Sequence, residues 1–384
     1  MNRYYNPVQI LQGPGCVENL PQVVASAGGD NARVLLVVWD RRVCALPVFA
    51  GLLARGEALC RSYCFQSSNP TVEQLFAAYQ ETKSFSPSVV IAVGGGSTMD
   101  VGKSLCCLYQ KELPDADALR RLICSRSYGT PAAKWIGIPT TAGTGSEVTC
   151  WATIWDPAQD TKRSVESQLN YAYAALVDPD LTDGMPLKLA VSSALDAVSH
   201  GVESYWARGT NCVSRALALE AVRTIMGSLD DLLAGKPEAR DAMARGSMLA
   251  GLAFSNTRTT ACHSISYPLT MHYHIPHGTA VSLLLAPVLR LNTPAVEGLD
   301  AMLAALGVKD AGELARCLGG YLDAAGLPAS LQEWGVKWED LSHLAQLGLT
   351  KGRADNNPVD LDPEMALSLL RDIYTTPYMK QKGA

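Results

Sequence analysis

The sequence predicts a chain in two parts, an α/β half built on a parallel sheet and an all-helical half after it. In the first half, short β-branched and apolar runs alternate with amphipathic stretches, which is the pattern of βαβ units. The predicted strands cover residues 33–39, 88–93, 135–139 and 174–177. From about Pro186 onward the strand signals stop, and turn-forming residues around Gly184 separate the halves. We therefore place the domains at residues 1–183 and 184–384.

The second half reads as successive helices that glycine and proline interrupt. The longest predicted helices cover residues 188–207, 213–233, 237–254 and 279–290. Ligands of open parallel sheets bind at the carboxyl ends of the strands. We therefore look for chemistry first in the loops that follow the predicted strands.

Composition and charge exclude several classes of protein. The chain has 384 residues, 48% of them hydrophobic, which is enough to bury a large core. A formal net charge of −5 provides no broad basic surface for nucleic acid or acidic membranes. No apolar run approaches the roughly 20 residues that span a bilayer, and the first residues are too polar for a signal peptide. We expect a cytoplasmic protein with a small-molecule partner, and eleven cysteines without CxxC spacing fit reduced thiols.

Three consecutive glycines, Gly94 to Gly96, lie between an apolar predicted strand and a predicted helix. Glycine allows close approach of a ligand, and a helix N-terminus offers free N–H groups to a phosphate. The stretch therefore predicts a pyrophosphate site. In the alternative interpretation, Ser97 and Asp100 form a capping box and the glycines only shape a turn. The pattern is not GxGxxG, which argues against an ordinary Rossmann site.

A second turn, at residues 138–147, also follows a predicted strand and precedes a predicted helix. Its threonines, including Thr140 and Thr141, suit a polar ligand, although the segment could be a plain β-to-α connection. Asp40 follows the first long predicted strand, where a carboxylate can accept hydrogen bonds from ribose hydroxyls and repel a 2′-phosphate. This position favours NAD(H) and leaves NADP(H) as the alternative. An aspartate there is also a common helix cap.

Four residues of the helical half predict a metal site. Asp196 and His200 are four positions apart and lie on one face of a predicted helix. His263 and His277 complete the set, and a Pro-His-Gly turn would hold His277 rigidly. A carboxylate with imidazoles suits a divalent ion and leaves room for a substrate oxygen. The alternatives are an Asp–His pair on a helix surface and histidines buried in a core without metal.

These residues together resemble the iron-containing (group III) alcohol dehydrogenase family. The resemblance rests on residues 68–71, 94–100, 139–149, 178–182, 196–200 and 276–278. It implies an N-terminal dinucleotide-binding domain and an all-helical metal-binding domain, a plan shared with dehydroquinate synthases. It also implies a homodimer and one divalent metal, Fe²⁺ or alternatively Zn²⁺, bound by Asp196, His200, His263 and His277.

The same resemblance implies a set of contacts to the nicotinamide cofactor. They fall in the two glycine-rich turns, after the predicted strands and in the region before the helical half. The implied residues are Asp40, Asn69, Gly95, Gly96, Ser97, Asp100, Thr140, Thr141, Thr149, Lys162 and Leu181.

The chain departs from the family pattern at Tyr267. The family usually has a second histidine four residues after the one that matches His263, and it is often assigned to proton relay or substrate contact. A phenol with a pKa near 10 is a poor base at neutral pH. We take Tyr267 as the candidate catalytic residue, with a bound water or the cofactor ribose as alternative routes for the proton.

A second departure lies just before His263. The family commonly has small apolar residues there, whereas this chain has Arg258, Thr259 and Thr260. The run at residues 259–270 resembles the phosphonoacetaldehyde reductases within the family. A cation and hydroxyls suit an anionic end such as a phosphonate, unless Arg258 points to solvent or pairs with a carboxylate. The predicted substrate contacts are Arg258, Thr259, Thr260, Phe254, Trp151 and Ser264.

The predicted activity is the reduction of a small aldehyde to a primary alcohol by hydride from NAD(P)H. Our first expectation for the substrate is phosphonoacetaldehyde, with 2-hydroxyethylphosphonate as the product. The alternatives within the family are a general short-chain alcohol dehydrogenase and a lactaldehyde-type reductase. Outside this reaction class, the alternatives are a lyase like dehydroquinate synthase and a non-catalytic nucleotide-binding protein.

Overall fold

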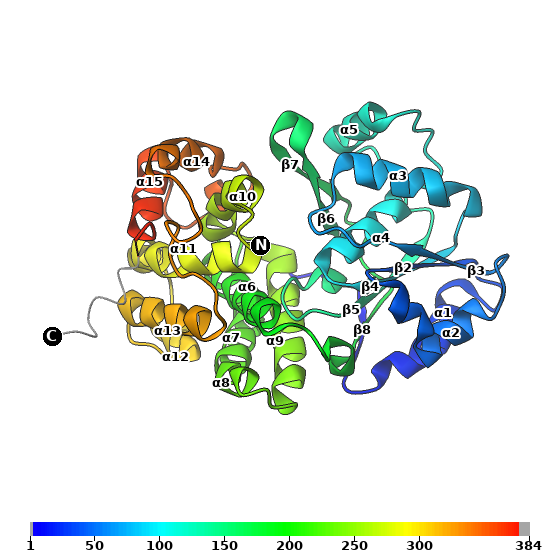
Figure 1. Cartoon of the computed structure of the whole chain (residues 1–384), viewed down its shortest axis with the longest axis horizontal. Coiled ribbons are helices and arrows are strands. Elements are labelled where there is room, and N and C mark those ends of the chain that lie inside the picture. Colours follow the sequence, from blue (N-terminus) through cyan, green and yellow to red (C-terminus); the bar gives the residue numbers. More distant parts are fainter. Residues whose placement is uncertain (1–2, 376–384) are drawn as a thin grey trace. The chain divides into compact units, whose positions relative to one another are not determined.

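The computed structural model describes residues 3–375, which form two compact units. The α/β unit consists of Asn6–Thr141 and Gly145–Asp183. The helical unit consists of the described residues from Gly184 onward, together with the short segment Ala142–Thr144 and the described residues before Asn6. Figure 1 shows the strands in the blue to green part of the chain and the helical unit in green to red.

The α/β unit is built on a six-stranded parallel sheet with the order β1-β8-β5-β4-β2-β3. The predicted α/β class is therefore confirmed, and all four predicted strands are present. Two edge strands, β1 and β3, were not predicted. The strands of this sheet are β1 (Gln9–Gln12), β2 (Val34–Val38), β3 (Cys60–Cys64), β4 (Val89–Gly94), β5 (Lys134–Pro139) and β8 (Ala174–Val177).

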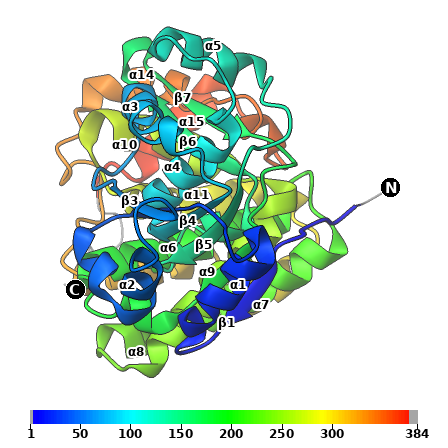
Figure 2. The same cartoon turned by 90° about the vertical axis from the view of Figure 1, so that its right-hand side faces the viewer.

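Both faces of the sheet are covered, and the side chains of its central strands alternate between two cores. Leu35 and Val37 of β2 belong to one core, and Val34 and Leu36 belong to the other. Every residue of β2 and β4 is buried, as expected for parallel strands with helices on both faces. In Figures 1 and 2, α3 and α5 lie on one side of the strands and α1 and α2 on the other. The helices of this unit are α1 (Leu20–Gly28), α2 (Pro47–Leu53), α3 (Val72–Thr82), α4 (Gly96–Leu108) and α5 (Ala116–Ser125).

The prediction of a helix after the second turn is wrong. Only the 3₁₀ helix η4 (Ser146–Val148) follows β5, and it leads into an antiparallel hairpin of β6 (Trp151–Asp156) and β7 (Thr161–Glu166). Gly145 has φ of 55°, so the chain turns sharply just before η4. The alternating residues Ala152 and Ile154 then bury one face of the hairpin in a core of the sheet.

The helical unit has a single extended core. Residues Val191, Leu195, Val198 and Val202 follow the helical repeat along α6 and are all fully buried in it. The helices of this unit are α6 (Leu187–Trp206), α7 (Cys212–Met226), α8 (Leu229–Leu233), α9 (Glu238–Thr257), α10 (Ala261–Tyr273), α11 (His277–Asn292), α12 (Leu299–Leu306), α13 (Ala311–Ala324), α14 (Leu341–Leu347) and α15 (Pro363–Asp372).

The helices agree with the sequence pattern except in one place. The single helix expected at residues 213–233 is two helices, α7 and α8, because the chain breaks at Gly227 and Ser228. Within the described residues, no helix combines the length and the apolarity needed to cross a membrane.

Candidate active site

The predicted metal ligands come from three helices of the helical unit. Asp196 and His200 lie on α6, His263 lies in the first turn of α10, and His277 is the first residue of α11. Ligand atoms of Asp196, His263 and His277 all lie within 4.8 Å of one another. His263 Nε2 is 3.4 Å from Asp196 Oδ1. The fold therefore brings together three of the four predicted ligands.

His200 lies beside this group without belonging to it. Its ring stacks on that of His263 at a centroid distance of 4.4 Å, and its Nδ1 is 3.3 Å from the carbonyl oxygen of Gly143. A proton on Nδ1, donated to that carbonyl, leaves the lone pair on Nε2, which is how histidine ligands are often oriented. The role of His200 as the fourth ligand stays a prediction.

The atoms that face one another in this cluster suit a divalent cation. Asp196 Oδ1 and His263 Nε2 are buried and form no hydrogen bond with any described residue. A buried carboxylate and an imidazole nitrogen without hydrogen-bond partners are costly unless a cation lies between them. Burial would raise the pKa of Asp196, but the surrounding histidines hold it well below its usual value. Burial lowers the pKa of His200 to about 4, so its ring is neutral and able to bind metal.

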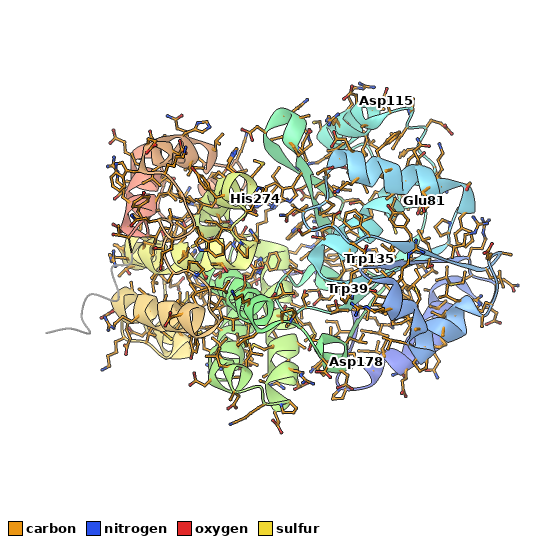
Figure 3. The ribbon with its side chains drawn as sticks, viewed as in Figure 1. Trp39, Glu81, Asp115, Trp135, Asp178 and His274 are labelled. Atoms are coloured by element: carbon orange, nitrogen blue, oxygen red, sulfur yellow. The ribbon has the colours of Figure 1, made fainter. Side chains whose placement is uncertain are left out.

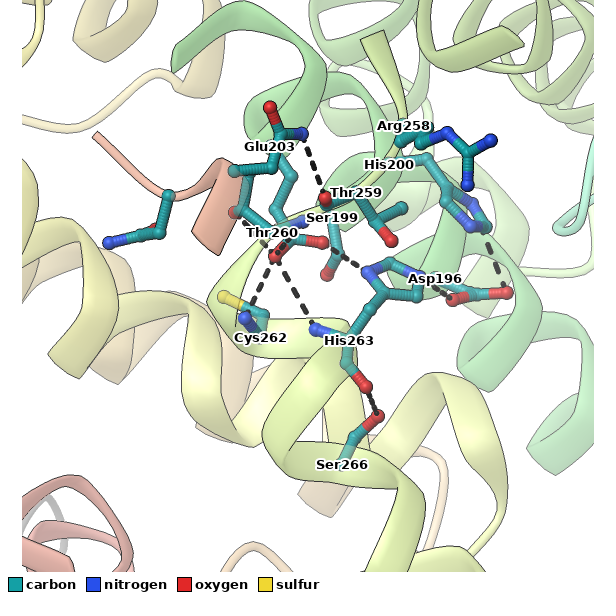
Figure 4. A network of polar contacts seen from close by, with 12 residues as sticks. Asp196, Ser199, His200, Glu203, Arg258, Thr259, Thr260, Cys262, His263 and Ser266 are labelled. Atoms are coloured by element: carbon teal, nitrogen blue, oxygen red, sulfur yellow. Dashed lines mark hydrogen bonds and ion pairs between the residues drawn. The ribbon is translucent and has the colours of Figure 1, made fainter. Parts of the chain in front are cut away.

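Glu203 is a candidate functional residue that was not predicted from the sequence. It lies on α6, is fully buried, and accepts hydrogen bonds from the backbone nitrogens of Thr260 (3.1 Å) and Cys262 (2.8 Å). It also accepts from the Thr260 hydroxyl at 2.7 Å and is bonded to Nδ1 of His263, as Figure 4 shows. This carboxylate holds the start of α10 and directs Nε2 of His263 toward Asp196. Glu203 follows Asp196 by seven residues, or about two helical turns, which places both on one face of the helix. This spacing could have indicated Glu203 from the sequence.

The turn that carries Arg258 has an unusual backbone. Arg258 has φ of 65° and ψ of 179°, a region that only glycine occupies readily. Its amide donates to Phe254 O at 2.8 Å, and its carbonyl accepts from the Thr257 hydroxyl at 2.9 Å. Such strain costs about 1–3 kcal/mol and is found mainly where function requires it.

Four of the other predicted substrate contacts lie in three different environments. Phe254 stacks on the ring of His200, the predicted fourth ligand, at a centroid distance of 4.2 Å. The hydroxyl of Thr260 donates to Glu203 and accepts from Trp206 Nε1, so it supports the turn. The hydroxyl of Ser264 donates to Gly348 O and accepts from Thr350 N. The substrate contacts of both residues stay predictions. Trp151 is the first residue of β6 in the α/β unit, and its substrate contact stays a prediction.

Tyr267 lies in the same helix as His263 and borders the cluster. Its ring is parallel to that of His277 at a centroid distance of 5.8 Å. Burial raises the pKa of Tyr267, while Arg353 and a hydrogen bond with Thr259 oppose that effect. The phenol therefore stays protonated at neutral pH and can act as a hydrogen-bond donor. His272 and His274, the remaining histidines of this region, are exposed, and Figure 3 labels His274.

The glycine-rich turn of the α/β unit joins β4 to α4 and is closely packed. A Cβ added to Gly94 would lie 2.5 Å from Thr98 Oγ1, and one on Gly95 would meet Thr141 at 3.3 Å. The capping-box alternative is wrong for this turn. Ser97 Oγ accepts from Asn69 N at 3.1 Å, and Asp100 accepts from Ser146 Oγ and Thr153 N at 2.9 and 2.8 Å. Among the described residues, no side chain caps the first turn of α4, which suits a phosphate there.

Asp40 follows β2 and caps the 3₁₀ helix η2 (Arg41–Ala45), as the alternative interpretation allowed. Its Oδ1 accepts from the amide of Arg42 at 2.7 Å, and its Oδ2 accepts from the Arg42 guanidinium at 2.7 and 2.9 Å. These bonds lower the pKa of Asp40. A carboxylate and a cation therefore lie side by side at the expected ribose position, and the choice between NAD(H) and NADP(H) stays open.

Lys103 is a second residue that the sequence reasoning missed. It is fully buried on α4, and its Nζ donates to the carbonyls of Ser146 (2.7 Å) and Trp151 (3.0 Å) and to the Thr149 hydroxyl (3.1 Å). Its Nζ also lies 5.0 Å from the ring centroid of Trp135, which Figure 3 labels. Lys103 therefore holds the second turn in place, and the predicted cofactor residue Thr149 is part of that support. The remaining predicted cofactor residues are Thr140 and Thr141 after β5, Lys162 in β7, and Leu181 in the 3₁₀ helix η6 (Pro179–Thr182).

Comparison with known proteins gives the family of the chain. Residues 7–179 match the family described as iron-containing alcohol dehydrogenase. Residues 190–374 match the C-terminal part of the Fe-containing alcohol dehydrogenase family. The chain belongs to the iron-containing alcohol dehydrogenase family. This confirms the predicted fold family, the predicted oxidoreductase class and the predicted iron-type metal.

The relatives within the iron-containing alcohol dehydrogenases act on different aldehydes. The chain is 29% identical to lactaldehyde reductase of Escherichia coli (strain K12), over 95% of this chain and 97% of the relative. It is 30% identical to phosphonoacetaldehyde reductase of Streptomyces viridochromogenes, over 78% of this chain and 80% of the relative. Its fold is similar to that of sulfoacetaldehyde reductase from Bifidobacterium kashiwanohense in complex with NAD⁺, with a TM-score of 0.84 and 26% identity. That match covers 98% of this chain and 99% of the other.

Proposed function

We propose that the protein reduces a small aldehyde with an anionic head group to the primary alcohol, using NAD(H) and Fe²⁺. The substrate that fits best is phosphonoacetaldehyde, which gives 2-hydroxyethylphosphonate. The observation that carries this proposal is Arg258, whose backbone has a glycine-like conformation. It lies four residues after Phe254, which stacks on the predicted ligand His200. A strained cation beside a candidate active site supports a role in binding an anion.

Two of the relatives support an anionic substrate. The phosphonoacetaldehyde reductase and the sulfoacetaldehyde reductase both act, by their names, on aldehydes that carry an acidic group. The NAD⁺ in the latter structure supports NAD(H) as the cofactor. Asp40 supports the same preference, while its neighbour Arg42 is a reason to test NADP(H) as well.

In the proposed reaction, a hydride adds to the carbonyl carbon and a proton to the carbonyl oxygen. When bound, a nicotinamide cofactor would be the source of the hydride and a divalent ion would supply Lewis-acid chemistry. Asp196, His200, His263 and His277 would hold the metal, and the first turn of α4 would hold the pyrophosphate. Arg258 and Thr259 bind the anionic head and so orient the aldehyde. Tyr267 keeps its proton, because burial raises its pKa, and donates a hydrogen bond near the reacting oxygen.

The test is the substitution Arg258→Ala. We expect the KM for phosphonoacetaldehyde to rise about ten- to a hundredfold, since a charge-assisted hydrogen bond contributes about 1.5–3 kcal/mol. The KM for propanal, which has no charged end, should change less than about twofold. An equal effect on both substrates would reject the anionic head group.

The second candidate is a lactaldehyde-type or general short-chain alcohol dehydrogenase. Lactaldehyde reductase, a relative that matches 95% of this chain, favours it. A panel of phosphonoacetaldehyde, lactaldehyde and propanal with NADH separates these activities by kcat/KM. The lyase and the non-catalytic alternatives predict no net consumption of NADH with any aldehyde.

We also propose that the protein acts in the cytoplasm as a homodimer. The eleven cysteines are all free, and the charge of the chain is mildly acidic, as in many proteins of that compartment. Analytical ultracentrifugation of the metal-loaded protein tests the dimer, and a monomer at micromolar concentration would reject it.

A further inference from the structure

Arg353 is a cation of the helical unit that forms no ion pair with any residue that the structure describes. It precedes the short 3₁₀ helix η9 (Ala354–Asn356) and is partly exposed. Among residues 3–375, its guanidinium pairs with no carboxylate and donates no hydrogen bond. The Oδ1 atom of Asp355, two residues further along the chain, accepts a hydrogen bond from the amide of Gly352 at 2.6 Å.

The guanidinium of Arg353 lies over a residue of the candidate active site. Its Cζ is 5.5 Å from the ring centroid of Tyr267, which is itself parallel to His277. Stacking on an aromatic ring orients a guanidinium while its N–H groups stay available to a ligand. Arg353 is therefore held in a defined place beside Tyr267.

The segment that carries Arg353 is fastened to the turn of Arg258. Asn356 Nδ2 donates to the carbonyl oxygens of Thr257 and Thr259, at 2.8 and 3.1 Å. On its other side, Thr350 N donates to Ser264 Oγ at 2.9 Å. Thr259 in turn shares a hydrogen bond with Tyr267. The two arginines thus belong to two segments that are tied together around the same phenol.

We propose that Arg353 is a second binding residue for the anionic head of the aldehyde and acts together with Arg258. This inference rests on the proposed function and makes it more specific. One cation suffices for a singly charged sulfonate, whereas two cations favour the doubly charged phosphonate. Arg353 therefore determines specificity between these two acidic aldehydes. The bound head group supplies Arg353 with the counter-charge that it does not find among the described residues.

The test compares Arg353→Gln with the wild-type enzyme, loaded with Fe²⁺, on three aldehydes. The KM for phosphonoacetaldehyde should rise about ten- to a hundredfold, the KM for sulfoacetaldehyde by a smaller factor, and that for propanal less than about twofold. Calorimetric binding of 2-hydroxyethylphosphonate to the complex with metal and NAD⁺ should weaken by the same factor as the KM of phosphonoacetaldehyde. Arg353→Lys, which keeps the charge, should recover part of that binding.

The matched control is Arg371→Gln. Arg371 also lies 5.5 Å from an aromatic ring centroid, that of Trp338, but on α15, which carries none of the predicted site residues. This variant should leave all three KM values unchanged. If wild-type enzyme prefers phosphonoacetaldehyde over propanal and Arg353→Gln keeps that preference, this inference alone is wrong. If the wild-type enzyme has no such preference, the proposed function fails and the inference with it.

Discussion

Some residues of the candidate site lower the stability of the folded protein. Arg258 is the clearest example. Its backbone lies at φ 65° and ψ 179°, where a Cβ is unfavourable. The hydrogen bonds around it hold this conformation, so the strain is a cost that the folded protein carries. A residue kept at such a cost is a strong candidate for ligand binding.

We predict that Arg258→Gly stabilises the protein while it weakens binding of the anionic aldehyde. Relief of strain contributes about 1–3 kcal/mol, from which the greater freedom of glycine in the unfolded chain removes about 0.5–1 kcal/mol. Urea denaturation should therefore show a higher free energy of unfolding, together with a raised KM for phosphonoacetaldehyde. Arg258→Ala is the control, because it removes the guanidinium but keeps the Cβ and the strain. A stabilisation of equal size in both variants would contradict this account.

Glu203 allows a second prediction at the scale of one side chain. Glu203→Gln removes the charge that holds Nδ1 of His263, and loss of such an outer partner typically weakens metal binding about 10–100-fold. Competition with a chromophoric chelator measures that affinity directly, without reference to turnover. Glu220→Gln is the control, since Glu220 pairs with Arg223 on the exposed face of α7. Equal metal affinity in Glu203→Gln and wild type would show that Glu203 only supports α10.

At the scale of elements, the sequence pattern predicts the buried strands and long helices well. The central strands β2 and β4 are continuous apolar runs, a pattern typical of parallel strands that are buried on both faces. The edge strands β1 and β3 mix polar and apolar residues because one side of each is exposed, so no clear period marks them. The hairpin β6–β7 was missed because its position depends on the buried Lys103, a contact distant in sequence.

Some residues of the candidate site could also be predicted from the sequence, and others could not. Asp196 and His200 could be predicted because a helix imposes their spacing, and His263 and His277 because the family pattern includes them. Glu203 and Arg353 could not be recognised, since their roles depend on contacts with residues 60 and 86 positions away. The hydroxyls of Thr260 and Ser264 face the protein, which the sequence of α10 does not reveal.

The element η4 allows a prediction about pH. Burial raises the pKa of Glu147 in η4 from 4.5 to about 7. Because the folded state binds this proton more tightly than the unfolded state, stability should fall as the pH rises from about 4.5 to about 7. The total loss is about 3 kcal/mol, since each pKa unit corresponds to about 1.4 kcal/mol. Urea denaturation across this range should show the loss in the wild type and not in Glu147→Gln. Parallel curves for the two proteins would contradict the assignment.

At the scale of the whole molecule, each unit carries one part of the chemistry that the family combines. The α/β unit provides the glycine-rich turn at the start of α4, and the helical unit provides the metal cluster with its two arginines. The family and the class of enzyme follow from matches that extend over both units. In our proposal, the choice of substrate depends on a much smaller part, the segments around Arg258 and Arg353.

The most direct test of this account is the oxidation of NADH by the Fe²⁺-loaded wild-type protein, followed by the nicotinamide absorbance. Phosphonoacetaldehyde should give a kcat/KM at least about tenfold above that of lactaldehyde and propanal, the minimum expected from one charge-assisted contact. Chelation of the metal should abolish the activity, and Fe²⁺ should restore it. A kcat/KM for lactaldehyde or propanal equal to or above that for phosphonoacetaldehyde would contradict the account.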